Sequence, residues 1–206
     1  MKQKKIEAVI FDLGRVIVNI DLRGGIFKYF TQNVAGSDED AMRTMIKDDV
    51  FRQAMQGKIT PQQLHEKLSD RFGLNLNYKE FVNTWCGMFS PNPGMAQLIA
   101  ELSGQVKLGL LSDADALHWG FIKNNYPEMK YFKKPTISFE VGITKPAKEI
   151  YVKAAENTGA AIENCIFFDD LAANVKGAID AGMQAVVFEN PQQVRRELAE
   201  RGFPKI

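Results

Sequence analysis

Short apolar runs alternate with amphipathic stretches along most of this chain. Residues 6–11, 106–111 and 165–168 are apolar runs typical of strands buried on both faces. Further strands are predicted at 136–139 and 185–188, and helices at 94–102, 116–125, 147–157, 173–181 and 192–201. Strands that alternate with helices indicate parallel βαβ units with right-handed crossovers. The pattern therefore predicts the α/β class, with five core strands in a doubly wound parallel sheet.

Residues 22–91 break this alternation and are predicted to be helical only. Ser37, Thr60 and Asn77 are residues that commonly cap the start of a helix, and Gly73 is typical of a helix end. The helical block is therefore an insertion after the first strand. The predicted domains are an α/β core of residues 1–21 and 92–206 and a helical cap subdomain of residues 22–91.

Polar side chains follow three of the apolar runs at the point where each strand would end. Asp12 comes after the first run, Ser112 and Asp113 after the second, and Asp169 with Asp170 after the third. In open α/β sheets, ligands bind at the carboxyl ends of the strands. Because buried carboxylates are costly, these acids indicate a site at that edge of the sheet.

Two loop residues are predicted to reach the same edge. Gly14 follows Asp12 and permits a tight turn, and Lys145 lies in a turn before a predicted helix. Taken singly, such residues have ordinary explanations, since acids cap helices and turns and loop lysines are solvated. Their combination at the ends of neighbouring strands favours a functional site.

Composition excludes several partners. The 206 residues carry 26 basic and 25 acidic side chains, so the net charge of +1 favours neither nucleic acid nor a membrane surface. No stretch approaches the roughly 18 apolar residues of a membrane span. Asp12 and Arg15 interrupt the apolar stretch behind the basic start, which argues against export. With Cys86 and Cys165 far apart, a reduced, cytoplasmic protein is expected, and both monomer and dimer stay open.

These motifs, in this order and across nearly the whole chain, resemble those of the haloacid dehalogenase superfamily, whose members are mostly phosphatases. In appearance the chain is similar to the α-glucose-1-phosphate phosphatase subgroup and to the phosphatase domain of soluble epoxide hydrolase. The resemblance implies a Rossmann-like core with a small helical cap, of the C1 type, inserted after the first strand. It also implies Mg²⁺ as the cofactor.

The resemblance implies a role for each acid. Asp12 would be the nucleophile that forms an aspartyl-phosphate, and also a metal ligand. Asp170 and the backbone carbonyl of Gly14 would complete the protein ligands of Mg²⁺, which favours oxygen donors. Asp169 is either a further ligand or an acid that orients the ligands, and Asn174 would support this corner through hydrogen bonds.

The same resemblance gives Ser112 and Lys145 the task of holding phosphate oxygens. This suits phosphoryl transfer, which depends mostly on positioning and charge stabilisation. Asp113 follows Ser112 where the similar subgroup usually has Asn; it either faces the substrate or caps the next helix, and capping is the expectation. Arg15 either contacts the substrate or packs beneath the cap.

Gly14 is a departure from the family pattern. Most family phosphatases have a second Asp there, which protonates the leaving oxygen and later activates water. The similar sugar-phosphatase subgroup shares this lack, which favours leaving groups that need little protonation. Asp21, Asp113, Asp115 and His118 are the candidates for a substitute acid.

The prediction is a Mg²⁺-dependent phosphatase that hydrolyses a small phosphorylated metabolite, with a sugar phosphate as the expected substrate. A 2-haloacid dehalogenase is one alternative, although a metal-free site gains nothing from Asp169 and Asp170. A phosphonate hydrolase, which uses a cap lysine, is another. A non-catalytic module that binds a phosphorylated ligand is the alternative outside enzymes. The cap helices carry no motif that names the substrate.

Overall fold

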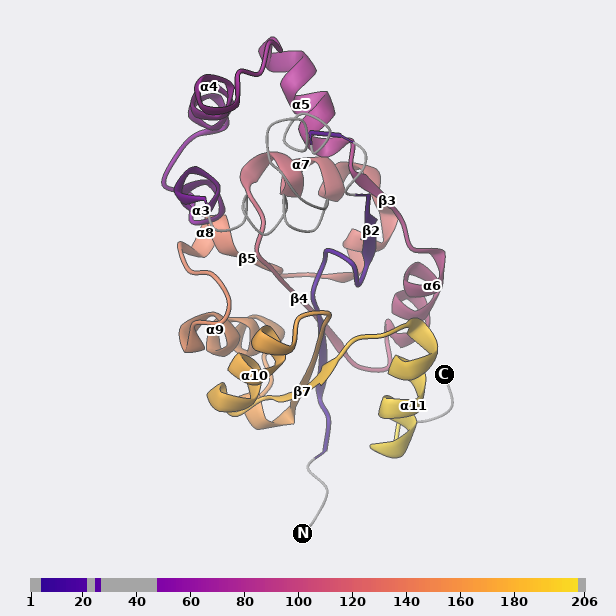
Figure 1. Cartoon of the computed structure of the whole chain (residues 1–206). Helices are drawn as coiled ribbons and strands as arrows, with labels where there is room; N and C mark the ends of the chain where they lie inside the picture. The colour runs from indigo at the N-terminus through magenta and orange to yellow at the C-terminus, as the bar shows by residue number, and fades with distance from the viewer. Residues whose placement is uncertain (1–4, 22–24, 27–47, 204–206) are drawn as a thin grey trace.

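The computed structural model describes residues 5–21, 25–26 and 48–203. Its centre is the predicted parallel sheet of five strands, and the structure gives the strand order β5-β4-β1-β6-β7. The strands are β1 (Ala8–Phe11), β4 (Lys107–Ser112), β5 (Thr136–Ile137), β6 (Cys165–Asp169) and β7 (Gln184–Val187). The first strand of the chain is therefore the middle strand of the sheet (Figure 1).

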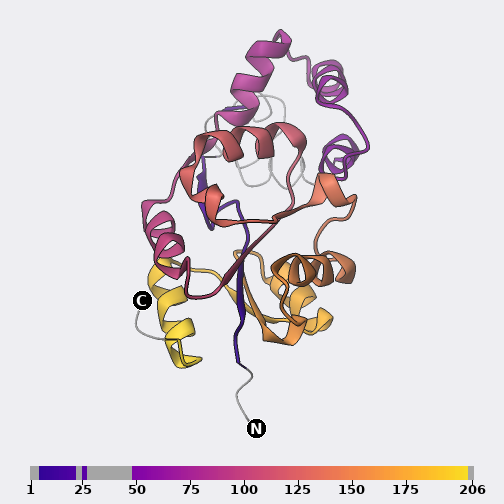
Figure 2. The ribbon, with the colours of Figure 1, turned by 180° about the vertical axis from the view of Figure 1, so that it is seen from behind.

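Side chains of a strand alternate between the two faces of the sheet. Because these strands are apolar at successive positions, both faces are apolar, and helices cover each of them. Val9 and Phe11 of β1 pack on one face, and Ala8 and Ile10 on the other. The first face is covered by α6 (Pro93–Leu102), α7 (Ala116–Asn125) and α11 (Pro191–Glu200), and the second by α9 (Lys148–Thr158) and α10 (Ala172–Ala181). Figure 2 shows the same two layers from behind.

The cap helices lie at the end of the molecule away from α11 (Figure 1). They are α3 (Asp49–Met55), α4 (Pro61–Phe72) and α5 (Tyr78–Cys86). The predicted helix starts at Thr60 and Asn77 are confirmed as capping boxes, and Gly73 ends α4 in a left-handed conformation. The predicted start at Ser37 lies outside the described residues. The cap helices share an apolar core of their own, against which α7 also packs.

Two boundaries differ from the predictions. Residues 22–91 are not helical only, because β3 (Phe89–Pro91) pairs antiparallel with β2 (Val18–Ile20). Each of these strands has three residues, too few for a periodic pattern, and their partners lie about 70 residues apart in sequence. The strand predicted at 136–139 stops after two residues, where α8 (Ser138–Val141) begins.

Two short 3₁₀ helices complete the described elements, η1 (Pro127–Tyr131) and η2 (Ile162–Asn164). None of the helices within the described ranges is long and apolar enough to cross a membrane.

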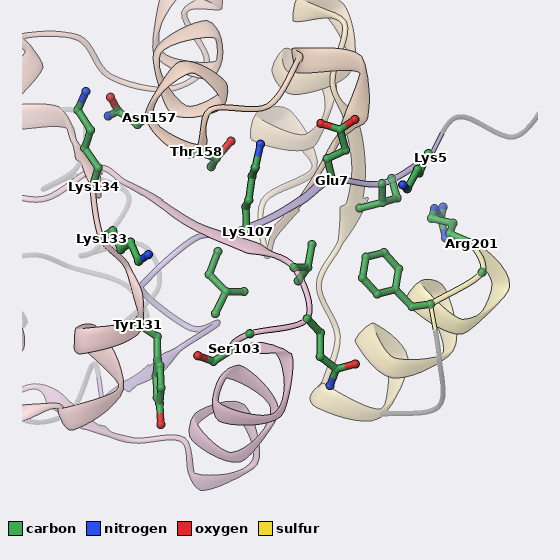
Figure 3. A pocket seen from close by; sticks show the side chains of 17 residues that line it. Lys5, Glu7, Ser103, Lys107, Tyr131, Lys133, Lys134, Asn157, Thr158 and Arg201 are labelled. Carbon is green, nitrogen blue, oxygen red and sulfur yellow. The ribbon is translucent and has the colours of Figure 1, made fainter.

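A hollow of about 880 Å³ opens at the amino-terminal edge of the sheet (Figure 3). Its lining includes the ends of α6, α9 and α11 and one acid, Glu7. Five basic residues line it, namely Lys5, Lys107, Lys133, Lys134 and Arg201. We call it the basic hollow.

Candidate active site

Strand register brings Asp12 level with Asp169. Phe11 of β1 pairs with Phe168 of β6, and the N–H of Asp12 donates to the carbonyl of Phe168 at 2.9 Å. The next residue on each strand is the aspartate. Because both strands are parallel neighbours in the middle of the sheet, their carboxylates emerge together at its carboxyl edge.

Asp12, Asp169 and Asp170 form what we call the acidic cluster. One carboxylate oxygen from each lies within 4.8 Å of the others. Asp12 and Asp169 are buried, and Asp170 is half-buried. Three carboxylates this close repel one another, so they need a cation between or beside them. The predicted meeting of residues 12 and 170 is therefore present in the structure.

Lys145 supplies one such cation. Its Nζ donates to Asp12 Oδ1 and to Asp169 Oδ2, both at 2.7 Å, and its side chain is 3% exposed. The lysine comes from the predicted turn before α9. Burial disfavours its charge, yet Asp12 and Asp169 outweigh that effect and raise the pKa of Lys145. The ammonium is therefore charged and shared between two acids.

The positive charge of Lys145 alone does not neutralise the negative charge of the acidic cluster. Burial, with the charge of Asp169, raises the pKa of Asp12 to about 7, although Lys145 opposes the rise. Burial and the charge of Asp169 also raise the pKa of Asp170, against the weaker effect of Arg15. These two carboxyls lie in an environment with excess negative charge, which a divalent cation would relieve.

Both carboxylate oxygens of Asp169 accept hydrogen bonds within the protein. Oδ1 accepts from the N–H of Leu171 at 2.8 Å, and Asn174 Nδ2 lies 3.0 Å from both carboxylate oxygens. With Lys145 on Oδ2, each oxygen already has two donors. Of the two roles left open by the sequence, the contacts favour the orienting one. Asn174 supports this corner as expected, and its own carbonyl accepts from the Tyr151 hydroxyl at 2.9 Å.

Ser112 ends β4, one residue beyond the level of Asp12, and is buried. The expectation that Asp113 caps the next helix was wrong. Asp113 Oδ1 instead accepts from the N–H of Lys145 at 3.1 Å, and the residue that caps α7 is Asp115. Asp113 thereby ties the loop after β4 to the lysine, and burial raises its pKa.

Sequence reasoning missed Ser138. Its buried hydroxyl accepts from the N–H of Ala114 at 3.1 Å and donates to the carbonyl of the same residue at 3.3 Å. Ser138 thus supports the loop after Ser112. No sequence signal pointed to it, because it stood inside an apolar run interpreted as a strand.

Three of the four suggested substitutes for the missing acid have other partners. Asp115 and His118 are buried and bond to each other and to Trp85. Asp113 is held by Lys145, and Asp21 is exposed at the end of β2. Asp113, Asp115 and His118 are therefore engaged in contacts within the protein.

The space beside Gly14 is filled by an apolar side chain. A Cβ added at Gly14 would lie 2.8 Å from Cδ1 of Ile20. The chain therefore has an aliphatic group where an acid at position 14 would begin. Arg15, with φ of 60°, reaches the acidic cluster, since its Nη1 lies 3.8 Å from Asp170 Oδ2.

Comparison with known proteins agrees with this architecture. The family model for haloacid dehalogenase-like hydrolases matches residues 6–182. A HAD family enzyme from Bacteroides thetaiotaomicron superposes with a TM-score of 0.78 at 26% identity, over 91% of this chain and 95% of that one. A magnesium complex of that enzyme superposes with a TM-score of 0.76 at 25% identity, over 91% and 95% of the two chains.

Two curated relatives are phosphate-releasing enzymes by name. The chain is 25% identical over 200 residues to D-ribitol-5-phosphate phosphatase of Bacteroides thetaiotaomicron, which covers 94% of this chain and 97% of the relative. It is 23% identical over 189 residues to pyrimidine 5′-nucleotidase YjjG of Escherichia coli, covering 87% and 84%.

A parallel sheet with an acidic cluster and one buried lysine at its carboxyl edge defines a class of hydrolase. The chain belongs to the haloacid dehalogenase-like hydrolase family.

Proposed function

We propose that the protein is a Mg²⁺-dependent phosphomonoesterase that acts on a small phosphorylated metabolite through an aspartyl-phosphate at Asp12. The observation that carries the proposal is the acidic cluster, with its three carboxylates within 4.8 Å and Lys145 bound to two of them. Phosphatases among the relatives and a magnesium complex of a similar enzyme support it.

The residues present fit Mg²⁺. It is a hard cation that takes oxygen ligands, commonly one or two carboxylates beside waters and substrate phosphate. Asp12 and Asp170 would hold it, together with the carbonyl of Gly14, while Asp169 orients the group. When bound, Mg²⁺ neutralises the carboxylates and the charge on the phosphoryl oxygens. The raised pKa values of Asp12 and Asp170 agree with this need for positive charge.

In the proposed reaction Asp12 attacks phosphorus, and the bond between phosphorus and the leaving oxygen breaks. Water then hydrolyses the aspartyl-phosphate, which releases inorganic phosphate and restores the carboxylate. Lys145 has three N–H donors, two of which bind Asp12 and Asp169. The third would hold a phosphoryl oxygen, and Ser112 would hold another.

For the substrate we propose a sugar or polyol phosphate. The similar ribitol-5-phosphate phosphatase supports this class. Residues 22–91 would act as the cap that selects the substrate, over a core of residues 1–21 and 92–206. Arg15 contacts Asp170 and Asp113 binds the N–H of Lys145, and both would border the substrate.

The test is phosphate release from a panel of phosphorylated sugars and polyols, with Mg²⁺ and with EDTA. Asp12→Asn removes the nucleophile and is expected to abolish turnover. Asp48→Asn is a matched control, because Asp48 is equally buried (7%) but caps α3 away from the acidic cluster. Equal turnover by wild type and Asp12→Asn would refute the proposal, and chloride release from 2-haloacids in EDTA would favour a dehalogenase instead.

A further inference from the structure

A second buried polar group joins the cap to the core, away from the acidic cluster. It consists of Trp85 on α5, Asp115 at the start of α7 and His118 on α7, which are 0%, 2% and 4% exposed. The Trp85 and His118 rings stack with centroids 4.9 Å apart and planes 5° apart. The Phe89 ring also contacts His118, in a T-shaped arrangement with centroids 4.9 Å apart. We call these three polar residues the cap–core triad.

Asp115 receives four hydrogen bonds. Oδ1 accepts the backbone N–H groups of Leu117 at 2.8 Å and His118 at 3.1 Å, so it caps α7. Oδ2 accepts Trp85 Nε1 at 3.0 Å and lies 2.9 Å from His118 Nδ1. Burial opposes the charge of Asp115, yet these partners hold its pKa below the ordinary value. A carboxylate with this set of donors is ionised.

The other ring nitrogen of His118 also faces an acceptor. Nε2 lies 3.1 Å from the carbonyl oxygen of Trp85. This carbonyl belongs to the last turn of α5, where backbone carbonyls have no partner within the helix. A carbonyl can only accept, so Nε2 must carry a proton. With an ionised carboxylate at Nδ1, both ring nitrogens must be donors.

We infer that His118 is a doubly protonated imidazolium, paired with Asp115, and that this buried pair positions the loop after Ser112 by fixing it to cap helix α5. Among the residues that the structure describes, the charged group that contacts His118 is Asp115. The Cys86 thiol donates to the carbonyl of Leu117 at 3.7 Å nearby. Burial, with the charge of Asp115, raises the pKa of Cys86 to about 12, so its thiol is neutral.

The loop links the triad to the catalytic machinery over a short distance in sequence. Ser112 ends β4, Asp113 holds the N–H of Lys145, Ala114 is held by Ser138, and Asp115 binds the cap. Asp115 lies three residues after Ser112, so its contact with the cap constrains the same short loop. The catalytic part of this inference rests on the proposed function; the protonation of His118 does not.

Nitrogen-15 NMR of histidine-labelled protein tests the protonation. The chain has two histidines, and His65→Gln assigns the His118 signals. We expect both His118 nitrogens to show attached protons at the pH of the activity assay, and Asp115→Asn to abolish that signature. An unprotonated Nδ1 or Nε2 in the wild type would overturn the inference, whatever the enzyme's activity.

Kinetics tests the positioning role. Asp115→Asn retains an oxygen for the helix cap but places an amide against the donors of Trp85 and His118, and kcat is expected to fall about 10²-fold. Asn190→Ala removes the cap of α11, far from the triad, and should leave kcat unchanged. If Asp115→Asn does not fold, His118→Gln, which retains one donor for the Trp85 carbonyl, is measured instead. Unchanged kcat in the folded variant would make the triad merely structural; a wild type without phosphatase activity would refute only the proposed function.

Discussion

The two edges of the sheet carry opposite charge. The carboxyl edge holds the acidic cluster with Asp113, and in the described residues its charged neighbours of opposite sign are Lys145 and Arg15. The amino edge holds the basic hollow, with five basic residues and Glu7 (Figure 3). The whole chain has a net charge of only +1, so the contrast comes from placement rather than composition.

The lysines of the amino edge are exposed to solvent, whereas Asp12, Asp169 and Lys145 of the carboxyl edge are buried. Helices in a parallel α/β fold run opposite to the strands, so their carboxyl ends, which carry partial negative charge, meet at the amino edge. Lys107 there donates to the carbonyl of Gly159, and Arg201 to the carbonyl of Glu197 at 2.7 Å. Basic residues at the hollow therefore complement helix ends. At the carboxyl edge the excess negative charge is carried by carboxylates that are close together and largely buried, and this is what identifies a cation-requiring site.

Replacement of one lysine at each edge gives the largest expected contrast. Lys145→Met leaves Asp12 and Asp169 buried without their shared cation, which should lower the free energy of unfolding by about 3 kcal/mol. Loss of a donor to the phosphoryl group should lower kcat about 10³-fold. Urea unfolding in EDTA and phosphate release measure the two effects.

The matched variant is Lys107→Met in the basic hollow. Its loss removes one hydrogen bond at a helix end, so the expected cost is within about 1 kcal/mol, with kcat unchanged. Equal effects of the two substitutions on stability and turnover would contradict the proposed difference between the edges.

Magnesium should stabilise the protein through the carboxyl edge alone. At a concentration 100 times its Kd, a ligand adds about 2.7 kcal/mol, which corresponds to a rise in Tm of about 5–10 °C for a chain of this size. Differential scanning fluorimetry should show this rise in wild type and its loss in Asp170→Asn. Asp180→Asn, an exposed acid on α10, is the control that keeps it. A rise that survives Asp170→Asn would place the metal elsewhere.

The contrast also shows what could be predicted from the sequence. The sheet, its helices and the meeting of Asp12 with Asp170 followed from apolar runs that end in polar residues, and Lys145 was predicted to reach them from a turn before a helix. Each run is a local pattern, and parallel register then brings the strand ends together. The pairing of β2 with β3 could not be predicted, because three-residue strands carry no pattern and their pairing is tertiary.

The polar contacts that the sequence analysis predicted wrongly or missed have one cause. Asp113 and Asp115 both precede a helix, and either could cap it; the structure gives that task to Asp115 and gives Asp113 the N–H of Lys145. His118 and Trp85 lie 33 residues apart in sequence and meet only through cap–core packing. Side-chain partners between distant segments depend on packing that no local spacing reports.

Asp12 gives the metal-free protein a distinct dependence on pH. Its pKa rises from 3.8 in the unfolded chain to about 7 in the folded one, so the folded state binds this proton more tightly. Stability from Asp12 is therefore greatest at low pH and is lost as pH rises from about 4 to 7. Between pH 5 and 8, wild type should lose about 1–3 kcal/mol relative to Asp12→Asn in urea unfolding with EDTA. If the stabilities of the two proteins depend on pH in the same way, the raised pKa of Asp12 in the folded state is contradicted. Excess Mg²⁺ should flatten the wild-type profile, because the metal competes with the proton for the carboxylate.

The smallest expected effect concerns the second Asp of the family pattern, which is replaced by Gly14 at the carboxyl edge. Gly14 does not have a left-handed φ, so Asp is sterically allowed there once Ile20 Cδ1, 2.8 Å from the added Cβ, is removed. The double variant Gly14→Asp, Ile20→Val introduces a carboxyl at the position where most family phosphatases have their second Asp. General acids contribute about 10²–10⁴-fold, and an acid not fully oriented should give about tenfold. The gain should appear in kcat for polyol phosphates, whose alcohols need protonation, and not for p-nitrophenyl phosphate.

The control is Ile20→Val alone, which should change neither rate. An equal gain on both substrates would show that the acid acts through something other than the leaving group, and no gain on either would contradict the prediction.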